Sequence, residues 1–188
     1  MVGKHEQKIL SPLLMHGDEK YLSFVFHRFL ETAVWTFAEL GVADLLAAAS
    51  EPQTADELAR SQGWNSEFLY RVLRAVADAN ILSEIQYNDV ESIEPAKVNR
   101  FKLTEDGYLL TSNHPSKARN VLRWEFSPLL RMSSNYLPEL VRTGYVNGNG
   151  LDQITGHRPI FDYLKDEQNR ELSHCFDEAM THASHASS

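Results

Sequence analysis

The sequence predicts a mainly α-helical protein built on a winged helix, which is a helix-turn-helix followed by a small β-hairpin, with additional C-terminal helices. Three observations predict this fold class. Thr54 to Glu57 form the pattern of a capping box, which opens a helix. A glycine-containing turn at 62–64 separates this helix from a second one. Two segments that alternate apolar and polar residues then follow at 81–87 and 100–104, as strands do.

The composition is that of an ordinary globular protein, with 188 residues of which 43% are hydrophobic and 23% charged. A chain of this length buries about 70% of the surface that its unfolded form exposes, so it needs no disulfide or structural metal to form a core. The single cysteine, Cys175, cannot close an intramolecular bridge and favours a reducing compartment. We therefore expect a cytoplasmic protein.

The net charge of −8 argues against two classes of partner. Nucleic-acid binding depends on Lys and Arg that displace counterions from phosphates, and here 26 acidic residues outnumber 18 basic ones. A membrane-spanning helix needs about 18 or more residues with few charges, and no uncharged stretch approaches that length. Pro12 interrupts the apolar segment 9–15, which therefore does not resemble a signal peptide. We expect neither a nucleic-acid partner nor a membrane partner.

A long helix is predicted from Tyr21 onward, after an N-terminal arm of residues 1–20. Its apolar residues recur at spacings of three and four, at Leu22, Val25, Phe26, Phe29, Leu30, Ala33, Val34, Phe37, Ala38 and Leu40. Phe24 and Trp35 fall outside that stripe, so the helix is apolar on more than one face. Such a helix is either a central core helix or part of a subunit interface, and the pattern leaves both open. Gly41 ends it, and a short helix follows.

The second helix of the helix-turn-helix begins at a cap formed by Asn65 or Ser66. Its predicted core-facing stripe consists of Phe68, Leu69, Val72, Leu73, Val76 and Ala77. The polar stretch 88–99 is predicted to be the hairpin loop of the wing. Together these elements define a winged-helix domain at residues 21–115.

Residues 116–188 form a third, helical segment. Its first apolar residues recur at helical spacing, while Pro128 and Pro138 argue against one unbroken helix. The stretch 143–156 holds four of the nine glycines and is predicted to be a loop. The helical rhythm then returns at 160–180.

Gly148-Asn149-Gly150 is the only G-x-G pattern, and it lacks the context of a nucleotide-binding loop. Gln153 stands at the third glycine position, and no predicted strand precedes the pattern. P-loop, H-E-x-x-H, C-x-x-C and G-x-S-x-G patterns do not occur in the sequence. The motifs therefore predict no cofactor-binding residue.

Other chemically capable side chains also have simple structural interpretations. His174, Glu178, His182 and His185 would share one helix face, but this stripe runs into the chain's tail and we interpret it as a solvated face rather than a metal site. Cys175 has no base at a recognisable spacing and is interpreted as a small buried hydrophobe. We therefore predict no metal ligand and no nucleophile.

Arg71 and Arg74 are the only cations on the second helix of the helix-turn-helix, and Glu67 and Asp78 balance their charges. A recognition helix normally adds donors for phosphates and base edges. The pattern therefore favours a winged helix that serves packing or dimerisation.

Seven segments in a fixed order resemble a known family: Phe37–Leu46, Thr54–Ala59, Leu69–Arg74, Phe101–Thr104, Leu140–Gly144, Gly156–Leu164 and Phe176–Met180. They are similar to the N-terminal dimerisation domain of the small-molecule O-methyltransferases that use S-adenosylmethionine, to which the plant caffeic acid and bacterial polyketide enzymes belong. The resemblance covers nearly the whole chain from Tyr21 onward. It implies an intertwined homodimer formed through the domain at 21–115.

The resemblance also implies that the later helices line the pocket of a small aromatic hydroxyl compound, the methyl acceptor. Positions that match Phe176 and Met180 approach the acceptor in the family. One turn earlier the family often has an aromatic residue, and this sequence has Leu172. Trp124 and Phe126 are further candidates, from local pattern alone.

The sequence departs from the family in one respect that decides the expected activity. Family members continue into an α/β domain whose glycine-rich loop binds S-adenosylmethionine and whose histidine is the general base. No strand followed by such a loop, and no matching histidine, occurs up to Ser188. We expect residues 116–188 to lead toward a catalytic domain that this chain lacks, with no catalytic, cofactor-binding or metal-binding residue, and the chain to be inactive alone.

Two other functions remain open from the sequence. One is a winged-helix DNA-binding regulator, which the acidic charge balance disfavours. The other is a non-catalytic dimerisation partner of a full-length methyltransferase.

Overall fold

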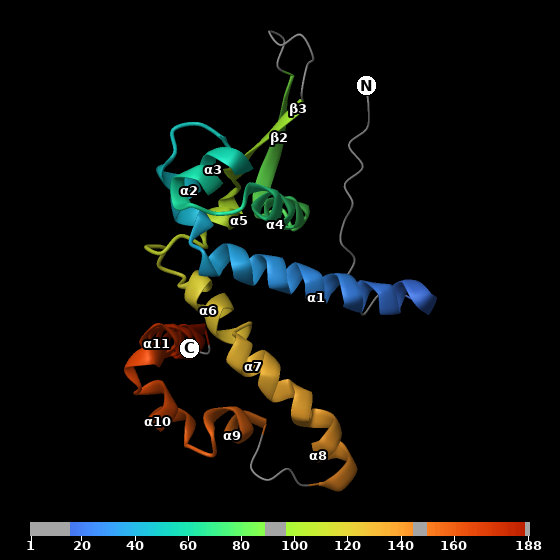
Figure 1. Ribbon diagram of the computed structural model, residues 1–188, viewed down its shortest axis with the longest axis vertical. Helices are drawn as coiled ribbons and strands as arrows, with labels where there is room; N and C mark the ends of the chain where they lie inside the picture. The colour runs from blue at the N-terminus through green and yellow to red at the C-terminus, as the bar shows by residue number, and fades with distance from the viewer. Residues whose placement is uncertain (1–15, 89–96, 145–149, 187–188) are drawn as a thin grey trace.

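The computed structural model describes residues 16–88, 97–144 and 150–186. Helices dominate, and one small sheet belongs to the winged helix, as the sequence predicted (Figure 1). In chain order the elements are α1 (Gly17–Glu39), α2 (Val42–Ala48), β1 (Gln53–Thr54), α3 (Ala55–Gln62), α4 (Ser66–Asp78), β2 (Leu82–Asn88), β3 (Lys97–Leu103), α5 (Glu105–Tyr108), α6 (Ala118–Glu125), α7 (Pro128–Ser133), η2 (Ser134–Tyr136), α8 (Leu137–Thr143), α9 (Gly150–Thr155), α10 (Ile160–Leu164), η3 (Glu167–Asn169) and α11 (Arg170–Ala186).

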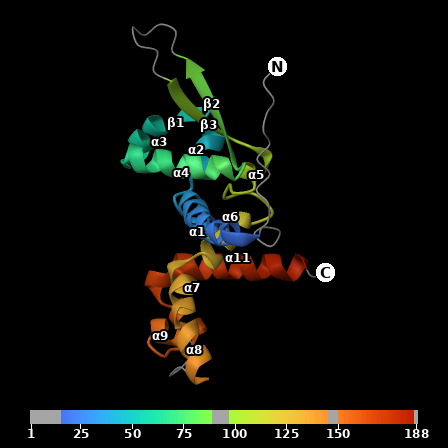
Figure 2. The same cartoon turned by 90° about the vertical axis from the view of Figure 1, so that its right-hand side faces the viewer.

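Helix α1 crosses the middle of the molecule, between the winged helix and the C-terminal helices in both views (Figures 1 and 2). It begins at Gly17, earlier than the predicted start at Tyr21, so the predicted arm overlaps its first turn. Its C-terminal half enters the first hydrophobic core, where Phe37 is fully buried. Gly41 follows with a φ of +66°, a left-handed conformation that glycine adopts without strain, and caps α2. The predicted helix–glycine–helix order is confirmed.

The helix-turn-helix has the capping interactions that the sequence predicted. Thr54 Oγ1 accepts a hydrogen bond from the Glu57 backbone N–H at 3.1 Å, and the Glu57 carboxylate accepts from the Thr54 N–H at 2.8 Å. The Asn65 side chain accepts from the Phe68 N–H and starts α4. The prediction that Phe68 faces the core is wrong, because this side chain is 64% exposed. It precedes the buried Leu69 by one residue, about 100° around the helix, and therefore faces solvent.

The wing is a three-stranded antiparallel sheet in the order β1-β3-β2. Leu82 pairs with Leu103 at the base of the hairpin, and the ladder continues to Asn88 opposite Lys97. Residues 97–99 are therefore strand, not part of the loop predicted at 88–99, whose positions 89–96 lie outside the described residues. Strand β1 was not predicted, because two residues are too short to show an alternating pattern.

The C-terminal helices form a second core around Trp124, Leu129, Leu164, Cys175 and Ala179. One prediction in this region is wrong: the stretch 143–156 is not all loop, because it contains α9. The helical rhythm predicted at 160–180 is confirmed, and it comprises α10, η3 and most of α11.

Gly150 explains why the loop prediction failed. It opens α9, and a Cβ there would collide with the Ser133 carbonyl group. The glycine therefore permits close packing rather than a flexible loop. Gly148 and Asn149 lie outside the described residues. Among the described helices, none is both long and apolar enough to cross a membrane.

Candidate functional site

Two of the five predicted acceptor-binding residues lie in direct contact. The Trp124 ring of α6 and the Phe176 ring of α11 meet edge to face, with centroids 4.9 Å apart. Phe161 of α10 extends this arrangement, with its ring centroid 5.8 Å from that of Phe176. Trp124 is buried, while Phe161 is 61% exposed. The three rings therefore form an aromatic row from the second core to the surface, and the sequence had not singled out Phe161.

A third predicted residue, Leu172, lines a cleft of about 460 Å³ bordered by α1, α7, α9 and α11. The cleft walls combine apolar side chains with a few polar and charged ones. They include Trp35, Glu39, Arg123, Ser127, Leu129, Met132, Ile154, Asn169, Glu171 and Cys175. This size and lining are typical of small-molecule sites, whose volumes are about 300–1,000 Å³.

The remaining two predicted residues lie apart from that cleft. Phe126 is the half-buried C-cap residue of α6. Met180 is one turn beyond Phe176 on α11 and is 43% exposed. Four of the five candidates thus belong to two places: Leu172 lines the cleft, and Trp124, Phe176 and Met180 lie along the row of rings and its continuation on α11. Phe126 belongs to neither.

Arg123 of α6 holds one edge of the cleft in place. Its guanidinium donates to the Glu39 carboxylate of α1 at 2.8 and 3.2 Å and to Glu171 of α11 at 3.0 Å. The hydrogen bonds that Arg123 donates to Glu39 raise the pKa of Arg123 above its usual value, despite the opposing effect of burial. Arg119, one turn earlier, donates to the Ala38 carbonyl group and to Asp44. These two arginines connect the first core to the second.

Two of the groups that were considered for metal binding and nucleophilic chemistry, Cys175 and Glu178, have structural roles. Cys175 is buried as predicted, and burial raises the pKa of its thiol, so the reactive thiolate is disfavoured. Glu178 forms an ion pair with Lys117 at 3.1 Å. Among the described residues, no three His, Cys, Asp or Glu side chains are arranged to hold a metal ion, and the His185 side chain lies outside them.

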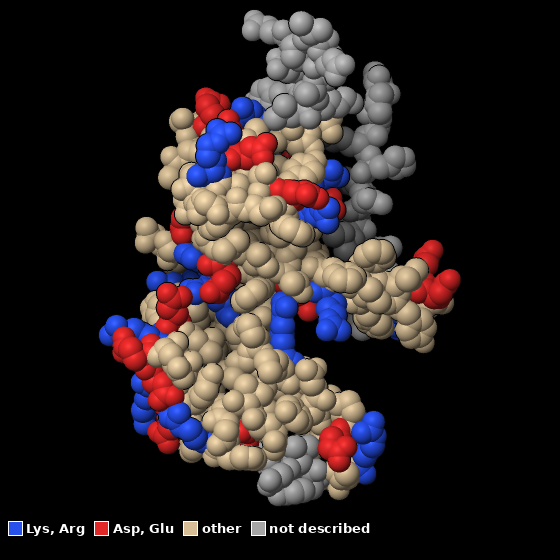
Figure 3. Space-filling view, in the orientation of Figure 1, with Lys and Arg blue, Asp and Glu red and all other residues tan. Residues whose placement is uncertain are grey.

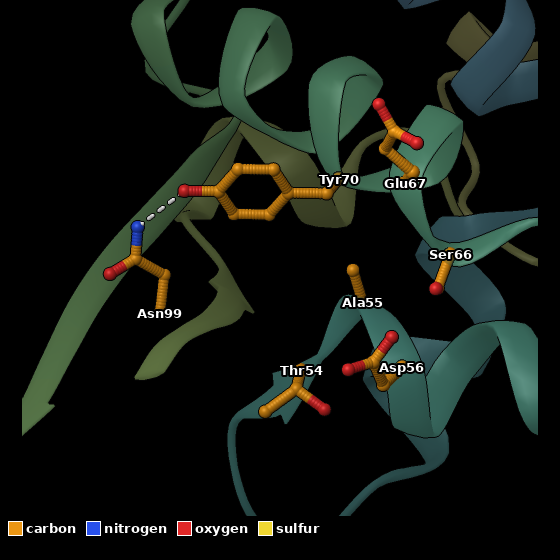
Figure 4. A pocket seen from close by; sticks show the side chains of 7 residues that line it. All are labelled: Thr54, Ala55, Asp56, Ser66, Glu67, Tyr70 and Asn99. Atoms are coloured by element: carbon orange, nitrogen blue, oxygen red, sulfur yellow. Dashed lines mark hydrogen bonds between the residues drawn. The ribbon is translucent and has the colours of Figure 1, made fainter. Parts of the chain in front are cut away.

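A shallower cavity of about 350 Å³ lies in the winged helix, between the starts of α3 and α4 and strand β3 (Figure 4). Asn99 donates to the Tyr70 hydroxyl group at 2.7 Å across one side of it, and Asp56 and Glu67 give it an acidic rim. The polar residues around this cavity either form hydrogen bonds with one another or are open to solvent. The cavity therefore offers no arrangement of side chains suited to catalysis.

The two arginines of α4 are ion-paired rather than free to contact nucleic acid. Arg71 pairs with Glu67 at 2.5 Å and Arg74 with Glu84 at 3.0 Å. Their positive charges are therefore compensated locally, which agrees with a helix that serves packing.

Exposed apolar side chains gather on the N-terminal half of α1. Its exposed side chains are Tyr21, Leu22, Phe24, Val25, Phe26 and Phe29. A second exposed group lies on the segment from α7 to α8, at Met132, Tyr136, Leu137, Leu140 and Val141. Figure 3 shows the molecule hollowed between α1 and this segment. Exposed apolar surface of this extent marks an interaction site.

Comparison with known families identifies the domain that carries this surface. Residues 22–113 match the family model of the O-methyltransferase dimerisation domain. This part of the chain is an O-methyltransferase dimerisation domain. The dimerisation domain includes the apolar half of α1 and extends through the wing and α5.

Known methyltransferases resemble the chain beyond the dimerisation domain. It is 31% identical over 147 residues to the 8-amino-8-demethylriboflavin N,N-dimethyltransferase of Streptomyces davaonensis, an alignment that covers 78% of this chain and 38% of that protein. The crystal structure of N,N-8-amino-8-demethyl-D-riboflavin dimethyltransferase from Streptomyces davawensis matches with a TM-score of 0.72 at 27% identity, over 92% of this chain and 46% of that one. This chain therefore spans less than half the length of these relatives.

A more distant structure shares the fold. Human N-acetylserotonin methyltransferase, solved in complex with S-adenosylmethionine, matches with a TM-score of 0.70 at 17% identity, over 97% of this chain and 47% of that one. The described residues of our chain do not fit that cofactor. Their sheet is antiparallel, and each of its strands belongs to the wing, so the described residues contain no strand followed by a glycine-rich loop of the kind that binds a nucleoside. We assign no step of methyl transfer to them.

Proposed function

We propose that this chain is the dimerisation and acceptor-lining portion of an S-adenosylmethionine-dependent methyltransferase that acts on a small aromatic hydroxyl compound. In this proposal the chain forms a homodimer, binds no S-adenosylmethionine by itself and is inactive alone. The observation that carries the proposal is the exposed apolar half of α1 within a dimerisation domain.

The homodimer is supported by the position of the two apolar surfaces. Helix α1 and the α7–α8 segment border the hollow (Figure 3), and both carry exposed apolar side chains that a second copy would cover. In a two-fold arrangement, α1 of each copy would pack between α1 and the α7–α8 segment of the other copy. This packing would cover the apolar surfaces of both elements at once. Such burial of aromatic side chains is the main source of interface free energy.

The acceptor surface is proposed on the predicted residues Trp124, Phe126, Leu172, Phe176 and Met180. The aromatic row of Trp124, Phe176 and Phe161 supports it, since aromatic acceptors bind to ring edges and flexible methionines. The relative from Streptomyces davaonensis is named for methylation of an amine, so a test of acceptors includes aromatic amines beside phenols. A cytoplasmic location is also proposed, and the lone buried cysteine favours it.

The first experiment measures mass and cofactor binding on the same sample. Light scattering is expected to give twice the chain's 21.4 kDa, and calorimetry with S-adenosylmethionine is expected to give no heat of binding. A monomeric mass, or measurable cofactor affinity of the chain alone, would contradict the proposal.

A second experiment tests the acceptor surface through the Met180 methyl group. The sequence has four methionines, so their ¹³C-labelled methyl signals are few enough to resolve, and Met180→Leu identifies the signal of interest. Titration with p-cresol or p-toluidine is expected to shift the Met180 signal. If the signal stays in place at saturating concentrations of both compounds, the acceptor surface lies elsewhere.

A further inference from the structure

Two hydrogen-bond donors beside the cleft have no acceptor among the described residues. They are Nε1 of Trp35, on α1, and Nη2 of Arg131, on α7. Both nitrogens are closed off from solvent. Donors without a partner are uncommon in protein interiors, because a buried N–H that loses its bond to water destabilises the folded state. Their occurrence side by side therefore points to an acceptor that the described residues do not supply.

The geometry keeps these two donors together. The Arg131 guanidinium carbon lies 5.5 Å from the centre of the Trp35 ring, in a cation–π contact. Its other terminal nitrogen, Nη1, donates to Thr32 Oγ1 at 3.2 Å, one turn before Trp35 on α1. Arg131 is thus fixed against α1 by a hydroxyl group and an aromatic ring.

The charge of Arg131 is also uncompensated within the described residues. Arg123, the other arginine near the cleft, is neutralised by Glu39 and Glu171. The described partners of Arg131 are a hydroxyl oxygen and an indole ring, neither of which carries a negative charge. A half-buried guanidinium without a carboxylate attracts an oxygen anion strongly, since hydrogen bonds to charged groups are about twice as strong as neutral ones.

The cleft next to these donors suits an aromatic molecule. Trp35 itself is part of the cleft wall, and Leu129, Met132 and Leu172 provide apolar surface around it. Figure 3 shows basic side chains at the back of the hollow below α1. An aromatic ring in the apolar part would direct an oxygen substituent toward the donors.

We propose that this cleft binds an aromatic compound through a carboxylate or carbonyl oxygen that accepts hydrogen bonds from Trp35 Nε1 and Arg131 Nη2. Because both nitrogens lie beneath the surface, binding requires a covering side chain to move, and the long, unbranched Met132 side chain of the cleft wall can turn aside without a change in the backbone. The cleft shares Leu172 with the proposed acceptor surface, but the inference concerns the donors of Trp35 and Arg131 and does not depend on Phe176 or Met180.

The experiment follows the indole N–H signals of the ¹⁵N-labelled chain by NMR. The sequence has three tryptophans, and loss of one signal in Trp35→Phe identifies that of Trp35. Three probes share one ring: 4-hydroxybenzoate carries a carboxylate, 4-hydroxyacetophenone a carbonyl group, and p-cresol neither. We expect 4-hydroxybenzoate to move the Trp35 signal downfield, as a new hydrogen bond does, and to bind about tenfold more tightly than p-cresol. A response to 4-hydroxyacetophenone of the same sign would assign the site to carbonyl oxygens as well.

Matched variants distinguish binding through Arg131 from non-specific binding of the aromatic ring. Arg131→Gln is expected to remove the preference for 4-hydroxybenzoate, a loss of about tenfold in affinity, and Arg131→Lys to restore part of it. Arg60→Gln, at an exposed arginine on α3, is expected to change nothing. Equal affinity for 4-hydroxybenzoate and p-cresol, or an unmoved Trp35 signal, would overturn the inference, because an internal water or a second copy of the chain would then be the acceptor.

Discussion

Both halves of α1 carry large apolar residues at helical spacing, but the two halves differ in how those residues are buried. The C-terminal half buries Ala33, Val34, Phe37 and Ala38 in the chain's own core, whereas Phe26 in the N-terminal half is 67% exposed. Spacing of apolar residues indicates that a helix face is covered, but not by which molecule. The difference shows that one helix serves two partners: its own winged helix at one end and, as we propose, a second copy at the other.

The largest expected effect is a difference in unfolding free energy between substitutions in the two halves of α1. Phe37→Ala removes a fully buried ring and should lower the free energy of unfolding by about 3–5 kcal/mol. Phe26→Ala, measured at a concentration low enough to keep the chain monomeric, should change it by less than about 0.5 kcal/mol. Urea unfolding followed by circular dichroism gives both values. Similar losses in the two variants would mean that Phe26 is covered within one chain.

The next effect concerns association. Phe26→Glu places a charge in the proposed interface and should raise the dimer dissociation constant by about 100-fold or more. The matched control is Phe68→Glu, at a phenylalanine of similar exposure on α4, which should leave the dissociation constant unchanged. Sedimentation velocity over a range of concentrations measures both. Dissociation by the control alone would place the interface on α4 instead.

A smaller effect is expected at the contact between the two cores. Arg123→Gln removes the hydrogen bonds to Glu39 and Glu171 and should lower the free energy of unfolding by about 1–2 kcal/mol. The loss of a fully buried ion pair would cost more, but here both carboxylates are partly exposed to solvent. Arg170→Gln, whose exposed pair with Glu167 lies within α11 and η3, should have almost no effect. Equal effects of the two variants would show that the contact does not hold the cores together.

The smallest effect is a dependence of stability on pH. The hydrogen bond from the Thr54 backbone, with a further contribution from Arg100, lowers the pKa of Glu57 below its usual 4.5. A lowered pKa in the folded state stabilises the protein above pH 4.5, and this stabilisation disappears as the pH falls through the lowered value. Glu57→Gln should therefore flatten the fall in the urea midpoint between about pH 5 and pH 3. The exposed Glu51→Gln is the control, and an unchanged slope in Glu57→Gln would contradict the assignment.

Local chemistry explains why much of the winged helix could be predicted. The capping box at Thr54, the cap at Asn65 and the glycine at Gly41 act through hydrogen bonds and backbone conformations set by a few adjacent residues. The wrong predictions concern positions whose burial or conformation depends on contacts with distant parts of the chain. Phe68 fits a generous apolar stripe but lies one position off the buried row, and Gly150 is required by its contact with Ser133 rather than by a turn.

The candidate site was only partly predictable for the same reason. Trp124 and Phe176 are 52 positions apart, and their contact depends on how α6 packs against α11, yet residue type had already indicated both. Trp35 and Arg131 could not have been paired from sequence, because no local pattern relates α1 to α7. Their missing acceptors become visible only when every buried donor is accounted for in three dimensions.

The most direct test of the central claim, that a second copy covers the N-terminal half of α1, is hydroxyl-radical footprinting at increasing protein concentration. The account predicts that Phe24, Phe26 and Phe29 become protected as the concentration rises, whereas Phe68, which is 64% exposed, is modified at a constant rate. If the phenylalanines of α1 are modified as fast as Phe68 at every concentration, the exposed half of α1 is not a dimer interface.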